Sequence, residues 1–143
     1  MPAKLVFRIG GAIRANRSNV CCRIDLKNAF KEISKAAILE VLTSEDSFAH
    51  LTSFAATMIA PDAALEAGGN RWGEAGGGVV QGDIPSGAFF CVGQQPSLLR
   101  LDRDCNLGGG LARGGLDNVY AVGPADVVLK AVLEFQRDLI EQN

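Results

Sequence analysis

Two glycine-rich stretches limit what this chain can fold into. The first, PDAALEAGGNRWGEAGGG, occupies residues 61–78, and the second, NLGGGLARGG, occupies residues 106–115. Glycine destabilises helix interiors and favours turns, so residues 61–78 are expected to form a hairpin or a loose loop. The second stretch is expected to connect to the strand that follows it.

The segment before the first glycine-rich stretch predicts one strand and two helices. The apolar run Val20–Ile24 predicts a short, mostly buried strand that ends at Asp25. Apolar residues at helical spacing then predict a helix over residues 28–42. A second helix is expected over residues 45–59, before the first proline of the glycine-rich stretch.

A third helix is predicted between the two glycine-rich stretches. It is expected to start near Asp83-Ile84-Pro85 and to run through SGAFFCVGQQPSLLRLD. Pro96 lies inside this segment and is expected to kink the helix or to end it early, because proline lacks a backbone N–H.

The C-terminal segment predicts a strand and a final helix. Val119–Val122 is an apolar strand, and the helix is expected to start after Pro124. Its buried side is expected to carry Val128, Val132, Phe135 and Leu139. This order of strands and helices predicts an α+β or α/β fold. The glycine clusters match neither a phosphate-binding loop nor a dinucleotide-binding fingerprint, which excludes a nucleotide-binding fold of either type.

Charge is distributed unevenly along the chain. At 143 residues with a net charge of −2, it fits one domain and gives no overall signal for nucleic-acid binding. No apolar run approaches the ~20 residues of a membrane helix, so no membrane span is expected. Residues 1–24 contain no acid but carry Lys4, Arg8, Arg14, Arg17 and Arg23. A strip that faces phosphates, an organelle transit peptide, and a solvated helix and strand are all compatible with this pattern.

The four cysteines indicate a reducing compartment. They show no CxxC spacing, which argues against a zinc site. The adjacent Cys21 and Cys22 are expected to be buried thiols on the first strand. The protein is therefore expected to be intracellular, with nucleus, cytoplasm and organelle not distinguished, since the acid-free N-terminus also allows an organelle.

The segment GGLDNVYAVG, residues 114–123, is the first candidate for a functional site. It predicts a tight turn that presents the carboxylate of Asp117 just before an apolar strand. Turns of this kind are common in enzymes that bind magnesium, but Asn118 stands where a second acid would complete a metal-binding pair. The turn is an active site, a former active site or only the polar corner of a hairpin.

Three segments in order give the chain a family resemblance. They are RIDLKNAFKEI, in which Phe30 follows Asp25 by five positions, then GGGVVQGDIPSGAFF, and then the turn with Asp117. In this order they resemble the palm of reverse transcriptases, particularly those of non-LTR retrotransposons. The resemblance covers roughly residues 5–135 and includes neither the fingers before the palm nor the thumb after it.

The resemblance implies a single palm domain over residues 1–143, of the α+β class, with a small antiparallel sheet and helices packed on one face. It implies an RNA-directed DNA polymerase that uses two Mg²⁺ ions and an RNA or DNA template-primer. Asp25 and Asp117 would be the catalytic carboxylates, and these two with Asn118 would be the metal ligands. The implied substrate-binding residues are Phe30, under the incoming sugar, and Gln81, Gly82 and Asp83.

The chain also departs from the family pattern. Gly115 replaces an aromatic residue, Asn118 replaces the second acid, and the proline of the second segment is shifted to Pro85. Loss of one carboxylate weakens a site for two divalent cations. Without fingers and a thumb, little holds a nucleic-acid duplex, and the net charge of −2 compensates weakly, so the isolated chain is expected to be inactive. The alternative is a non-catalytic structural or interaction subunit with protein partners, in which Asp25 only caps the following helix.

Overall fold

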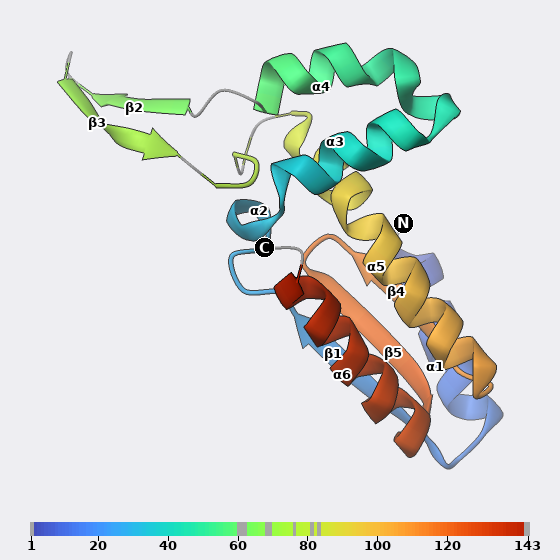
Figure 1. The fold of residues 1–143 in the computed structure, drawn as a ribbon. Coiled ribbons are helices and arrows are strands. Elements are labelled where there is room, and N and C mark those ends of the chain that lie inside the picture. Colours follow the sequence, from blue (N-terminus) through green and yellow to red (C-terminus); the bar gives the residue numbers. More distant parts are fainter. Residues whose placement is uncertain are drawn as a thin grey trace. The chain divides into compact units, whose positions relative to one another are not determined.

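The fold consists of two compact units, each described here by itself (Figure 1). This computed structural model describes residues 2–59, 63–67, 70–75, 77–80, 82 and 84–141. The terminal unit combines Met1–Lys27 with Gln95–Gln142, and the central unit is formed by residues 28–94. No helix in these described ranges combines the length and apolarity that crossing a membrane requires.

The terminal unit contains a three-stranded antiparallel sheet in the order β1-β5-β4. Its elements are α1 (Pro2–Ala15), β1 (Asn19–Asp25), the second half of α5 (Ser86–Leu107), β4 (Leu111–Gly115), β5 (Asn118–Pro124) and α6 (Ala125–Glu141). The predicted α+β class and the small antiparallel sheet are confirmed. The strands β1 and β5 and the last helix begin and end close to the predicted residues.

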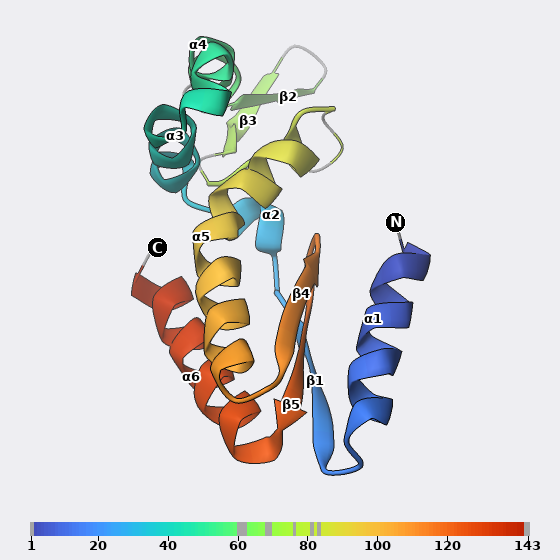
Figure 2. The same ribbon diagram turned by 90° about the vertical axis from the view of Figure 1, so that its right-hand side faces the viewer.

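Helices cover both faces of this sheet (Figure 2). The second half of α5 and α6 pack on one face, whereas α1 contacts β1 and β5 from the other. The expectation that the helices pack on one face of the sheet is therefore correct for α5 and α6 and wrong for α1. The core under α5 and α6 consists of Leu101, Cys105, Ala112, Val119, Ala121, Val128, Ala131 and Phe135.

The thiols of β1 are not both buried. Cys22 packs against the core, but Cys21 is exposed, so the expectation of two buried thiols is wrong for Cys21. Successive side chains of a strand point to opposite faces. Cys21 therefore points away from α5 and α6, to the face on which α1 lies.

The second half of the second glycine-rich stretch is a strand, β4, rather than a simple connection. A Cβ atom on Gly110 would lie 2.2 Å from the carbonyl oxygen of Val122, and one on Gly114 would lie 2.7 Å from Leu98 Cδ2. Only glycine allows β4 to approach β5 and α5 so closely at these positions. The glycines therefore permit tight packing here, in addition to interrupting helices.

Asp102 on α5 joins this helix to β4. One carboxylate oxygen accepts a hydrogen bond of 2.8 Å from the backbone N–H of Ala112, and the other accepts one of 2.6 Å from Arg113 Nη1. Both side chains of the ion pair are partly buried. This double contact holds the helix over the edge strand of the sheet.

The third predicted helix is longer than expected. The helix α5 continues to Leu107 with Pro96 inside it, so the expectation that proline could end it early is wrong. Proline removes only one intrahelical hydrogen bond. Phe90 before it and Leu101 after it are almost fully buried, and their packing stabilises the two halves.

In its described residues, the central unit contains four short helical segments, a hairpin and the first half of α5. The segments are α2 (Ala29–Glu32), α3 (Lys35–Ser44), the 3₁₀ helix η1 (Asp46–Leu51) and α4 (Thr52–Ile59), and the hairpin is β2 (Ala63–Ala67) with β3 (Asn70–Ala75). Of the hairpin and the loose loop expected for residues 61–78, the paired strands at 63–67 and 70–75 favour the hairpin. The helix predicted for residues 45–59 begins as η1 and continues as α4.

The helix predicted for residues 28–42 is wrong as a single element. Ile33 has an extended backbone (φ −67°, ψ 129°), which ends α2. The hydroxyl of Ser34 then accepts a hydrogen bond of 3.3 Å from the backbone N–H of Ala37 and caps α3. A serine with this N-cap bond starts a new helix where the apolar spacing alone predicts continuity.

Packing in the central unit depends on a glycine of α5. A Cβ atom on Gly93 would lie 2.7 Å from Cγ1 of Ile38, which is fully buried on α3. On α2, the ring of Phe30 stacks on that of Phe90 from α5, with centroids 4.8 Å apart. Both contacts draw α5 against the short helices.

Replacing Asp102 by alanine should lower the free energy of unfolding by about 1–3 kcal/mol, because the N–H of Ala112 loses its acceptor. The matched control is Asp104→Ala, which removes a surface ion pair to Arg103 on the same helix and should cost ~0–1 kcal/mol. Chemical denaturation of both variants compares the two losses. Equal losses would contradict a special role for Asp102.

Replacing Gly93 by alanine should destabilise the central unit by about 1–3 kcal/mol, because the added methyl group meets Ile38. A Cβ atom on Gly87, in the same helix, meets nothing within 4 Å. Gly87→Ala should therefore stabilise the helix by up to about 1 kcal/mol. Thermal unfolding of the two variants should show shifts of opposite sign, and shifts of the same sign would refute the packing argument.

Candidate functional site

The pairing of β1 with β5 brings the predicted metal-site residues of the terminal unit together. Asp25 lies directly opposite Asn118 in the antiparallel register. The backbone N–H of Leu26 donates a hydrogen bond of 2.9 Å to the carbonyl of Asp117. The prediction that the strand ending at Asp25 and the strand starting near Asn118 are neighbours is confirmed.

Asp117 lies in the turn between β4 and β5, as its sequence context predicts. Leu116 just before it adopts a left-handed backbone (φ 54°), which is unusual for a side chain of this size. The tight turn that this conformation makes leaves Asp117 exposed at the end of the hairpin. Asp25 at the end of β1 is also exposed, while Asn118 is half-buried. Two acids and an amide therefore gather at one end of the sheet.

A basic residue completes this group, and sequence reasoning missed its role. Arg23 Nε donates a hydrogen bond of 3.0 Å to Asn118 Oδ1, and Asn118 Nδ2 donates one of 2.8 Å to Asp117 Oδ1. Arg23 is two residues before Asp25, so both side chains point to the same face of β1. The period of the strand was the signal that could have placed Arg23 here.

These contacts decide how well the group could hold magnesium. Mg²⁺ prefers oxygen ligands, but the oxygen of Asn118 accepts from a guanidinium and its amino group faces Asp117. The positive charge of Arg23 also opposes a divalent cation at this position. In the described part of the chain, no group of three or more His, Cys, Asp and Glu side chains could hold a metal ion. In this arrangement the site fits a pair of magnesium ions poorly.

The predicted substrate-binding residues belong to the central unit. Phe30 is half-buried and stacks on Phe90, so it has a packing role in its own unit. Gly82 is exposed with φ +105°, a conformation that favours glycine, and a Cβ atom there would meet nothing within 4 Å. Gln81 and Asp83 lie outside the described residues.

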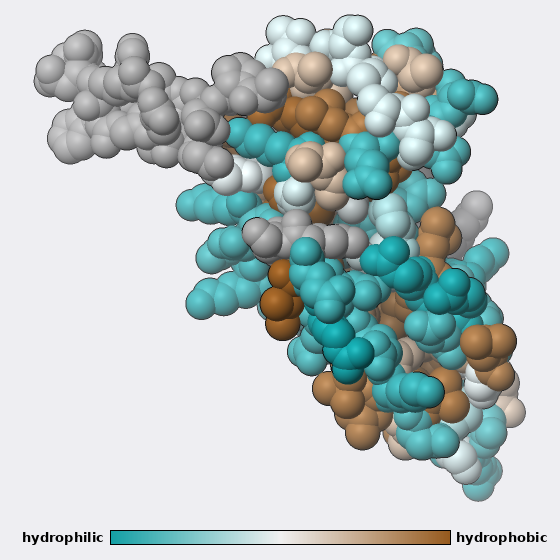
Figure 3. All heavy atoms as spheres, viewed as in Figure 1, coloured by the Kyte–Doolittle hydropathy of each residue, from teal (hydrophilic) through white to brown (hydrophobic). Residues whose placement is uncertain are grey.

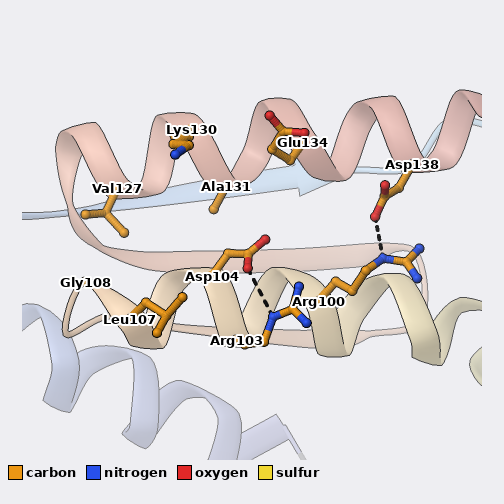
Figure 4. A pocket seen from close by; sticks show the side chains of 10 residues that line it. All are labelled: Arg100, Arg103, Asp104, Leu107, Gly108, Val127, Lys130, Ala131, Glu134 and Asp138. Carbon is orange, nitrogen blue, oxygen red and sulfur yellow. Dashed lines mark hydrogen bonds and ion pairs between the residues drawn. The ribbon is translucent and has the colours of Figure 1, made fainter.

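A groove between α5 and α6 in the terminal unit was not predicted (Figure 4). It has a volume of about 590 Å³ and is open to solvent. Its lining residues are Arg100, Arg103, Asp104, Leu107, Gly108, Val127, Lys130, Ala131, Glu134 and Asp138. Arg100 pairs with Asp138 at 2.6 Å and Arg103 with Asp104 at 3.3 Å, so charges in the groove largely neutralise one another. The lining carries three basic and three acidic side chains, so it has no net charge on which a ligand would be selected.

Three of the cysteines are not activated nucleophiles. Burial raises the pKa of Cys21, Cys91 and Cys105. For Cys105 the pKa rises to about 11, with further contributions from the nearby carboxylates of Asp102 and Asp104. A thiol must lose its proton to act as a nucleophile or metal ligand, so these three side chains remain neutral at physiological pH.

Comparison with known proteins adds no family to these observations. No family model matches the chain, and a search of the curated proteins finds no match. The site at the end of β1 and β5 is therefore interpreted from its own geometry.

Proposed function

We propose that the chain is a reverse-transcriptase-derived domain, similar to an RNA-directed DNA polymerase palm, that has lost nucleotidyl transfer. One observation carries this proposal. Asn118 stands opposite Asp25 and beside Asp117, and its amide is held between Asp117 and Arg23 by hydrogen bonds of 2.8 and 3.0 Å. The two acids and the amide lie together at one end of the sheet, as metal ligands would. The guanidinium of Arg23 lies beside them and supplies a positive charge from the chain itself.

The placement of the acids supports the ancestry. In a palm, two carboxylates at neighbouring strand ends hold metal ions that stabilise the charge that develops during phosphoryl transfer. Here one acid ends β1 and the other lies in the turn before β5, and the bond from Leu26 N–H to the Asp117 carbonyl joins the two segments. Three features that the resemblance implies, an acidic strand end, an acidic turn and a following apolar strand, thus belong to one sheet.

The contacts of Asn118 support the loss of activity. An amide supplies no negative charge, and the guanidinium of Arg23 contributes a positive one in its place. Replacing an acid by an amide and adding a cation both reduce the affinity of the group for divalent ions. The overall charge of −2 gives little electrostatic help in holding a nucleic-acid duplex.

A non-catalytic structural or interaction role is the second candidate. Its support is a row of exposed apolar side chains on α6, which comprises Leu129, Leu133 and Ile140. Apolar residues aligned on one flank of a helix often mark a surface that a partner covers. This role is compatible with the first candidate, since a palm without catalysis could be retained for its surfaces.

Restoring the missing acid tests the proposal. The native chain should bind Mn²⁺ weakly, and Asn118→Asp combined with Arg23→Gln should bind it about tenfold more tightly or better, because a carboxylate is gained and a cation removed. Calorimetric titration measures the affinity. Adding Asp25→Ala to this double variant should abolish the gain.

Asn106→Asp is the control for the added carboxylate, because it adds one negative charge near the end of α5. It should leave Mn²⁺ affinity unchanged. If Asn118→Asp with Arg23→Gln binds no better than the native chain, or if removal of Asp25 has no effect, the turn is only a hairpin corner and the proposal fails.

The native chain should also show no primer extension on an RNA template, with either Mg²⁺ or Mn²⁺. The physical reason is the loss of the second acid together with the guanidinium beside it. Incorporation of labelled nucleotides is the measurement, with an active reverse transcriptase as the positive control. Template-dependent extension by a pure preparation, abolished by Asp117→Ala, would show that the site is still active.

A further inference from the structure

The outer edge of β1 is open. Within the described ranges β1 pairs only with β5. The bond from Leu26 N–H to the Asp117 carbonyl shows that even-numbered residues of β1 exchange hydrogen bonds with β5. The N–H and C=O groups of Cys21, Arg23 and Asp25 therefore point outward, where another strand could pair with them.

An exposed apolar flank of α6 lies above this edge. Leu129, Leu133 and Ile140 are 62%, 53% and 77% exposed, and their helical spacing places them on one flank. Bonds from Asp102 hold α5 over β4, whereas α6 contacts β5 and β1. The flank turned away from α5 is therefore on the β1 side. Figure 3 shows hydrophobic side chains that interrupt the hydrophilic surface at the left and lower left of α6.

We propose that this edge and flank form the interface of a symmetric dimer, in which β1 pairs antiparallel with β1 of a second copy. A right-handed connection from β5 through α6 would place its next strand beside the outer edge of β1. The helix α6 is therefore already positioned to cover one further strand there. A twofold axis normal to the sheet would give a continuous six-stranded sheet with both α6 helices on one face.

Charge complementarity selects the register of this pairing. With Ile24 on the twofold axis, Arg23 lies opposite the second copy's Asp25, and Asp25 lies opposite the second copy's Arg23. Both side chains are exposed, and the structure shows no ion pair for Asp25 among the described residues. A register centred on Arg23 would oppose two like charges, which is unfavourable. A register centred on Cys22 would place Arg23 opposite Cys21 and Asp25 opposite Asn19 of the second copy, so neither charged side chain would face an opposite charge.

The helices fit this register as well. Each α6 lies over β5 and β1, so the two copies of α6 would be separated by two strand spacings, or about 10 Å. Helices pack with their axes about 8–10 Å apart. Because Ile24 lies about 17 Å along β1 from Asn19, the axis passes near the C-terminal half of α6. Leu133 would then face Ile140 of the second copy across the junction, and their apolar surface would be removed from water.

The mass of the full chain in solution tests the proposal. Analytical ultracentrifugation over the micromolar to millimolar range should show a monomer–dimer equilibrium. Leu133→Lys and Asp25→Arg should each raise the dimer dissociation constant about tenfold or more, by placing charge in the flank or by opposing like charges. Leu107→Lys is the matched control, because Leu107 is 84% exposed on α5, and should have no effect.

A mixing experiment tests the register. Asp25→Arg carries arginine at both positions, and Arg23→Asp carries aspartate at both. Each variant alone should be largely monomeric, but an equimolar mixture should form heterodimers with affinity near that of the native chain, because every charged pair becomes complementary. Native mass spectrometry distinguishes the species, and circular dichroism confirms that each variant is folded.

Three outcomes would overturn the proposal. The native chain could remain monomeric over the whole range, in which case the edge would be left to a strand of a different protein. Leu133→Lys could dimerise as well as the native chain, or the mixed variants could fail to form heterodimers. These readouts are masses, so they are separate from the metal titration that tests the proposed function.

Discussion

The terminal unit depends on the pairing of β1 with β5. This register directs Cys22 and Ile24 toward the core under α5 and α6, and it places Arg23 and Asp25 on the opposite face. A shift of one residue would exchange the two sets, because side chains alternate along a strand. The same register sets Asp25 opposite Asn118. The core and the candidate site are therefore consequences of one set of backbone hydrogen bonds, and a change of register would disrupt both.

Sequence patterns were sufficient to predict a helix or strand where a single physical effect determines its structure. The last helix was predictable because its apolar spacing is strong, and Val128 and Phe135 are indeed almost fully buried. The strand β4 was not predictable from LARGG, because glycine has low strand propensity and its small size matters only when β5 and α5 approach it. The break between α2 and α3 depends on the side-chain bond of Ser34, which competes with a continuous apolar pattern.

Of the residues in the candidate site, only the two acids could be assigned their places from the sequence. Asp25 and Asp117 stand at a strand end and in a turn, positions that local sequence reveals. Arg23 was missed because its contact with Asn118 joins residues that are 95 positions apart. That contact changes the interpretation of the site, since a guanidinium occupies the amide oxygen of Asn118 that a metal would otherwise bind. The electrostatics of the candidate site depend on the pairing of β1 with β5, which brings Arg23 to Asn118. A short sequence motif gives no information about that pairing.

The order of the two units along the chain has a consequence for biosynthesis. The central unit is one continuous segment, whereas the terminal unit is assembled from both ends of the sequence. A ribosome therefore releases all of residues 28–94 while β1 still lacks its partner strand. Since domains fold as their residues emerge, the helices around Phe90 can form early. The sheet must wait for β5, and until then β1 is a solitary strand with both edges unsatisfied, which is the period in which a chaperone would protect it best.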